Sequence, residues 1–108
     1  MTTFDDREKA FEAQYARDQE MQFKIIARRN RLLGLWAAEK MDLTREEAEA
    51  YARDVVRADF EEAGDEDVVR KLLGDFAAAG VDVEDSEIRA EIEAKTVEAR
   101  RQMIEAQG

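Results

Sequence analysis

The chain has 108 residues, of which 44% are hydrophobic and 41% charged, and its formal net charge at pH 7 is −10. This size suits one domain. The composition is too apolar for a wholly disordered chain and too charged for a membrane protein. There is no Cys and no His, which excludes disulfides and argues against a transition-metal site. The acidic balance argues against nucleic-acid binding.

No apolar run approaches the roughly 20 residues of a membrane-spanning helix, and no signal-peptide pattern opens the chain. We therefore expect a cytoplasmic protein that does not insert into a membrane. Its elements can be predicted in chain order, because the chain contains no Pro and only five Gly, so that breaks in helical patterns are few.

The first predicted helix covers residues 4–41. Strong helix formers fill this segment, and Thr3 is placed to cap its start. Gly34 is its only interruption, so the pattern allows one long helix or two abutting ones.

Capping signals predict the second and third helices. Thr44 and Glu47 have the spacing of a capping box, and an apolar stripe follows up to Gly64, the expected residue after the helix end. Asp65 is predicted to cap a third helix, which Gly80 ends.

A fourth helix is predicted after a cap at Asp85 or Ser86. Its thin apolar stripe is interrupted by Lys95 and Thr96, and the stripe consists of Ile88, Ile92, Ala99 and Met103. No segment alternates with period two, so no sheet is expected. The predicted fold is all-α: an antiparallel four-helix bundle with an N-terminal extension that is mobile or helical.

The first helix is predicted to be longer than its partners. A helix over residues 4–41 would span ~57 Å, whereas the second and third would span only ~20 to 30 Å. Residues 4–20 offer a single narrow apolar line of Phe4, Phe11 and Tyr15, which is too small a face to fold alone. We predict an arm over residues 1–20 and a bundle over residues 21–108, with docking of the aromatic line on the bundle as the alternative.

Helical periodicity also predicts a core. The residues expected to be mostly buried are Phe23, Ile26, Leu33, Trp36, Tyr51, Val55, Val56, Leu72, Leu73, Phe76 and Ile92.

Residues for catalysis are scarce. The single Ser, Ser86, stands at a predicted helix start and is expected to cap it, and no phosphate-binding Gly-rich loop is present. The only concentration of basic residues is the basic cluster, Lys24, Arg28, Arg29 and Arg31. It is either a solvated face that pairs with the acidic later helices or a docking patch for an acidic partner or phosphate.

Two segments carry a resemblance to a known family. They are residues 4–12, FDDREKAFE, and residues 27–40, ARRNRLLGLWAAEK, with weaker likeness at residues 49–52 and 65–68. The chain resembles the ζ subunit of alphaproteobacterial F-type ATP synthases over essentially its whole length. It departs from that family at Asp42, where relatives often carry Gly. This difference puts the first turn in question, because Asp adopts left-handed backbone angles less readily than Gly.

The resemblance implies a four-helix bundle with a mobile N-terminal segment, and an inhibitor rather than an enzyme. The expected partner is the catalytic head of an F-type ATP synthase, meaning its nucleotide-binding subunits and central stalk. The arm would enter a catalytic interface and block ATP hydrolysis, and the protein would lie peripheral to the membrane-bound enzyme. Carried onto this sequence, the arm residues are Phe4, Arg7, Glu8, Phe11, Glu12, Tyr15 and Gln19.

Two other functions stay open at this point. One is a small nucleotide-binding module that senses adenine nucleotide through the basic cluster and Trp36, and the other is a helical adaptor for an unrelated partner. No bound cofactor is expected apart from that possible nucleotide.

Overall fold

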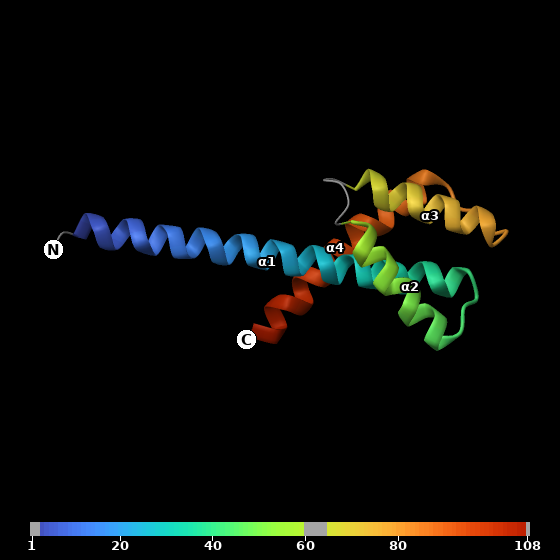
Figure 1. The fold of residues 1–108 in the computed structure, drawn as a ribbon, viewed down its shortest axis with the longest axis horizontal. Helices are drawn as coiled ribbons and strands as arrows, with labels where there is room; N and C mark the ends of the chain where they lie inside the picture. The colour runs from blue at the N-terminus through green and yellow to red at the C-terminus, as the bar shows by residue number, and fades with distance from the viewer. Residues whose placement is uncertain (1–2, 60–64, 108) are drawn as a thin grey trace.

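The computed structural model describes the backbone of residues 3–59 and 65–107, and the side chains of residues 18–59 and 65–106. Four helices follow one another: α1 (Thr3–Lys40), α2 (Arg45–Ala58), α3 (Glu66–Ala78) and α4 (Asp85–Gln107). Consecutive helices run in opposite directions (Figure 1), and the described residues form no strand. The predicted all-α, four-helix fold is confirmed.

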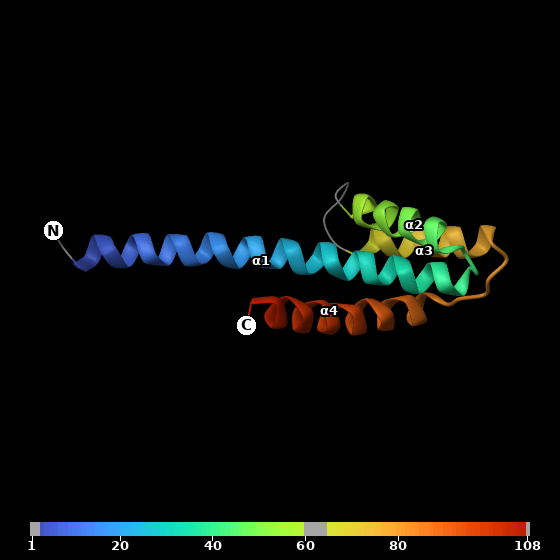
Figure 2. The same cartoon turned by 90° about the horizontal axis from the view of Figure 1, so that it is seen from below.

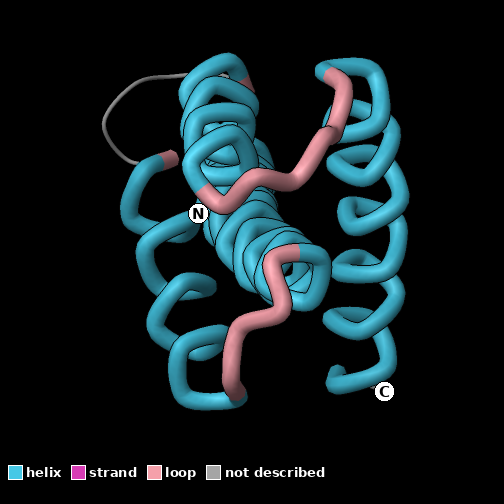
Figure 3. Tube along the Cα trace, turned by 90° about the vertical axis from the view of Figure 1, so that its right-hand side faces the viewer, coloured by secondary structure: helices cyan, strands magenta, loops and turns pink. Residues whose placement is uncertain are grey.

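α1 is the central element of the bundle. α2 and α4 pack on opposite flanks of α1, and α3 contacts both α2 and α4 (Figure 3). An edge-to-face contact between the rings of Trp36 and Phe76, with centroids 5.8 Å apart, also ties α1 to α3. The other three helices therefore surround only the C-terminal part of α1.

α1 is one continuous helix of 38 residues, which corresponds to ~57 Å at 1.5 Å per residue. Its N-terminal part projects beyond the other three helices (Figure 2). The molecule measures 65 × 27 × 21 Å, and its radius of gyration is 17.5 Å, against about 13 Å for a compact domain of this length.

The core draws on all four helices. Of the residues predicted to be buried, five are buried and four are half-buried. The buried cluster consists of Leu33, Ala37, Val55, Val68, Val69, Leu72, Phe76, Ile88 and Ile92, with Trp36, Tyr51 and Leu73 packed against it. The predicted inner stripe of α4 is also buried at Ile88, Ile92 and Ala99.

The prediction was wrong for Phe23 and Ile26, which are 56% and 38% exposed. The reason is the length of α2. Its C-cap residue Asp59 lies at the level of Arg29, and Phe23 and Ile26 come before Arg29 on α1. Figure 2 shows α4 continuing along α1 beyond the end of α2. The apolar side chains of this part of α1 thus lie beyond the end of α2, the helix that was expected to cover them.

The capping box of α2 is confirmed. The Glu47 amide donates to the Thr44 hydroxyl, and the Thr44 amide donates to the Glu47 carboxylate at 2.8 Å. α2 ends at Ala58 rather than continuing towards Ala63, and the expected stop at Gly64 lies outside the described residues. Asp65 does hold the N-cap position of α3, but its side chain makes no capping hydrogen bond.

The turn after α1 is a left-handed C-cap. Asp42 has φ of +58°, its amide donates to the Glu39 carbonyl, and the Leu43 amide donates to the Ala38 carbonyl. This pair of hydrogen bonds is the Schellman motif, in which Gly is the preferred residue at the left-handed position. Asp42 therefore adopts the left-handed conformation that its difference from the Gly of the resembled family had put in question.

Gly34 permits the close approach of α1 and α2. A Cβ atom at this position would lie 2.7 Å from the Cα of Ala52 and 3.2 Å from Cγ2 of Val55. Carbon atoms pack best about 3.5 to 4.0 Å apart, so the two helices could not come this close if residue 34 carried a side chain.

Candidate functional site

The projecting part of α1 is the first candidate site. Among the described side chains, Asp18, Gln19 and Glu20 are exposed, and Ile25 is the first buried one. The backbone of positions 4, 11 and 15 belongs to α1, and these positions fall within about 40° of one another around a helix with 3.6 residues per turn. The side chains of Phe4, Arg7, Glu8, Phe11, Glu12 and Tyr15 lie outside the described residues.

The basic cluster lies on α1 where the bundle begins, and all four of its side chains have a partner within the chain. Lys24 lies 3.2 Å from Glu20, one turn away on α1. Arg28 donates to the side-chain oxygen of Gln102 on α4 at 3.4 Å.

Arg31 forms the strongest of these surface pairs. Its guanidinium donates two hydrogen bonds to Glu49 of α2, at 2.8 and 3.3 Å. This hydrogen bonding lowers the pKa of Glu49 and raises the pKa of Arg31. Pairing with acidic residues of the later helices, one of the two interpretations that the sequence leaves open, is therefore present at Arg31.

Arg29 differs from the rest of the cluster because it is buried. Its guanidinium donates to the Asn30 side chain at 2.9 and 3.1 Å, and lies 3.0 Å from Asp65 and 3.7 Å from Asp59. Asp59 ends α2 and Asp65 precedes α3, so Arg29 joins the ends of two helices to α1. The carboxylate of Asp65 pairs with Arg29, and the backbone of Asp65 has helical dihedral angles rather than the extended ones typical of a capping residue.

Other ion pairs fix α4 against the bundle. Lys40 of α1 lies 3.1 Å from Glu87, and Arg89 donates to both carboxylate oxygens of Glu66 on α3, at 2.8 and 2.9 Å. The bond from Arg89 lowers the pKa of Glu66. These exposed pairs orient the helices, although each contributes little to stability.

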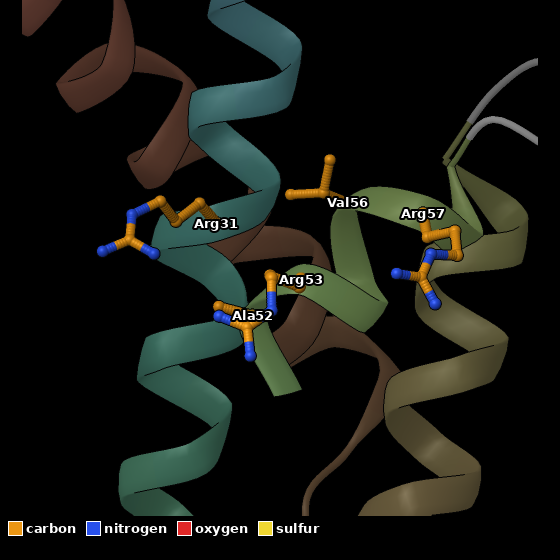
Figure 4. A pocket seen from close by; sticks show the side chains of 5 residues that line it. All are labelled: Arg31, Ala52, Arg53, Val56 and Arg57. Atoms are coloured by element: carbon orange, nitrogen blue, oxygen red, sulfur yellow. The ribbon is translucent and has the colours of Figure 1, made fainter. Parts of the chain in front are cut away.

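The second candidate site is a groove between α1 and α2, called here the arginine groove. It has a volume of about 440 Å³ and is lined by Arg31, Ala52, Arg53, Val56 and Arg57. In Figure 4, Val56 lies between the Arg31 and Arg57 side chains, and Arg53 reaches across the front of α2. The site thus combines an apolar floor with three guanidinium groups.

Sequence reasoning missed Arg53, Val56 and Arg57 as site residues, because they are separated in the chain from the basic cluster. The available signal was the spacing of Arg53 and Arg57, one helical turn apart with an apolar residue between them. Only the packing of α2 on α1 brings them onto the same groove as Arg31.

The described part of the chain offers little for catalysis or metal binding. It contains no group of three or more metal-ligating side chains, and Ser86 is exposed near the start of α4. Trp36 is half-buried against Phe76, with the Lys40 ammonium 5.5 Å from its ring. No helix in this part is long and apolar enough to cross a membrane.

Comparisons with known proteins agree with this all-helical fold. A family model described as ATPase inhibitor subunit zeta matches residues 1–102. A protein whose structure was solved in solution by NMR is 49% identical, with a TM-score of 0.72, and the match covers 80% of this chain and 98% of that one. The search of curated proteins finds no match.

Proposed function

Since this chain belongs to the ATPase inhibitor subunit zeta family, we propose that it blocks ATP hydrolysis by inserting its N-terminal arm, residues 1–20, into the catalytic head of an F-type ATP synthase. Family membership makes the chain a non-enzymatic regulator that interacts with an F-type ATP synthase. The insertion mechanism, and contact with the nucleotide-binding subunits and the central stalk, are the finer steps proposed here.

The observation that carries the proposal is the projection of α1. Its N-terminal part extends beyond the bundle (Figure 1), and Asp18, Gln19 and Glu20 are exposed at its base. A helix with a narrow apolar line cannot bury that line by itself, so it suits a groove on a partner.

Within the arm, we assign different roles to two groups of residues. Phe4, Phe11 and Tyr15 act as apolar anchors, because buried aromatic side chains usually dominate such interfaces. The remaining arm residues set the register at the polar rim; they are Arg7, Glu8, Glu12 and Gln19.

The bundle, residues 21–108, holds the arm at a fixed place on the enzyme, which itself lies at the cytoplasmic face of the membrane. In the basic cluster, Lys24, Arg28 and Arg31 are exposed and supply contacts to an acidic partner surface or to phosphate. Arg29 supports this surface from inside, since it is buried against Asp59 and Asp65.

The test is a titration of the full chain and of a chain lacking residues 1–20 into purified ATP synthase while ATP hydrolysis is followed. The full chain should inhibit, and the shortened chain should not, although its circular dichroism melt still reports a folded bundle. Equal inhibition by both chains would refute the arm mechanism. Binding of ATP that survives removal of the arm, without any inhibition by the full chain, would favour a nucleotide-sensing module instead.

A further inference from the structure

The geometry points to the arginine groove as a docking surface for an acidic, amphipathic peptide segment of the ATP synthase. This inference rests on the proposed function, because it assumes that the bundle must be held on the enzyme while the arm acts. It concerns a different surface from the arm, formed by Arg31 of α1 and by Arg53, Val56 and Arg57 of α2.

The groove has the form of a peptide-anchoring site. Ala52 at its floor is buried and Val56 is half-buried, while the three arginines around them are exposed. The cavity of about 440 Å³ is large enough for an apolar side chain to enter, and the guanidinium groups stand where flanking charged groups would lie (Figure 4).

The charge of the groove is opposite to that of the molecule. The chain carries −10 overall, yet three cationic side chains line this one groove. Arg53 and Arg57 stand one turn apart on the same helix, an arrangement of like charges that disfavours the helix.

The fold neutralises these two arginines only in part: Glu49, one helical turn before Arg53 on α2, interacts with it through charge without forming a close ion pair. Among the described residues, Arg53 has no carboxylate within ion-pair distance, and Arg57 has only Asp54, at the limiting distance of 4.0 Å. By contrast, Arg31, Arg89 and Arg101 each lie within 3.1 Å of a carboxylate of this chain. Within the part of the chain that the structure describes, Arg53 and Arg57 therefore keep guanidinium donors available for carboxylates of a partner.

These features select the chemistry of the partner. Guanidinium groups match carboxylates in a two-pronged geometry, and Arg53 and Arg57 are separated by ~6 Å along the helix axis. A partner segment with Asp or Glu residues one helical turn apart would pair with both arginines, and an apolar residue between them would cover Val56 at the floor of the groove. Inorganic phosphate alone would leave the apolar floor uncovered.

The experiment uses the full chain, labelled at its C-terminus, and purified ATP synthase as the probe. Arg53→Glu combined with Arg57→Glu should weaken binding by about tenfold or more, since charge reversal turns attraction into repulsion. Inhibition at saturating concentration should remain, because the arm is unchanged. Lysine at both positions should restore part of the affinity. Thermal melts of the glutamate variant should show only a small loss of stability, because both side chains are exposed and Arg57 lies in the last turn of α2.

The matched control is Arg100→Glu combined with Arg101→Glu on α4. These arginines also lie beside exposed apolar residues, Val97 and Ile104, and the variant changes the net charge by the same amount. It should bind within about threefold of the unmodified chain, because the groove is intact and the changed charges lie on the opposite flank of α1.

Several outcomes would overturn the docking surface. The first two are unchanged binding of ATP synthase by the groove variant and equal weakening of binding by the α4 control. The third is loss of self-association in the groove variant, which would make the occupant of the groove a second copy of this chain. The fourth is competition for the groove by millimolar inorganic phosphate alone. Failure of the arm mechanism looks different: the unmodified chain would bind ATP synthase through the groove without inhibiting hydrolysis.

Discussion

Replacing Gly34 with Ala tests how closely α1 and α2 pack. The added Cβ would lie 2.7 Å from the backbone Cα of Ala52, so the helices must separate by about 1 Å to reach normal contact. Overpacking of this kind costs about 1 to 3 kcal/mol, and the backbone clash favours the upper part of that range. The higher helix propensity of Ala offsets about 1 kcal/mol of this cost, so the free energy of unfolding should fall by about 1 to 2 kcal/mol.

The matched control is Gly74→Ala in α3. A Cβ at Gly74 meets no atom within 4 Å, so only the propensity gain of about 0.5 to 1 kcal/mol remains. Urea denaturation should therefore move the two midpoints in opposite directions, with unchanged slopes. If Gly34→Ala is as stabilising as Gly74→Ala, the close approach of α1 and α2 is refuted.

Four further predictions concern the arm, the turn after α1 and the core. Phe11→Ala should weaken inhibition of ATP hydrolysis by about 2 kcal/mol or more, whereas Glu12→Ala at the rim should cost only about 0 to 1 kcal/mol, and less at high salt; dose-response curves measure both. Backbone amide order parameters in the free protein should be lower over residues 1–18 than over residues 23–41, because only the latter pack in the bundle. Asp42→Gly should stabilise the chain by about 0.5 to 1 kcal/mol in urea denaturation, since Gly relieves the left-handed strain and removes a negative charge from a helix C-terminus. Leu72→Ala, at a fully buried position, should cost about 2 to 5 kcal/mol in the same assay.

Each of these predictions has a clear contrary result. Phe11→Ala that inhibits like the unmodified chain, or that melts several degrees lower, would place the aromatic ring in the bundle core. Uniformly high order parameters from Phe4 onward would contradict a separate arm. An unchanged midpoint for Asp42→Gly would contradict strain at the left-handed position, and an unchanged midpoint for Leu72→Ala would contradict the packing of α3.

The sequence by itself determined the features that depend on residues close together in the chain. The capping box of Thr44 and Glu47 spans a single helical turn, so local geometry alone fixes it. The stop at Gly80 likewise follows from one residue with φ of +75°. Helical periodicity identified Leu33, Leu72 and Phe76 as core residues, because a regular apolar spacing defines one face wherever the helix packs.

Tertiary structure decided everything that depends on where a helix ends relative to its neighbours. Phe23 and Ile26 have the apolar pattern of a core, yet they are exposed because α2 stops near Arg29. Arg29 belongs to a basic run in sequence, but it is buried because Asp59 and Asp65 reach it from two other helices. The arginine groove arises in the same way: the packing of α2 on α1, which is close at Gly34, places Arg53 and Arg57 on the same groove as Arg31, and no pattern within either helix encodes that arrangement.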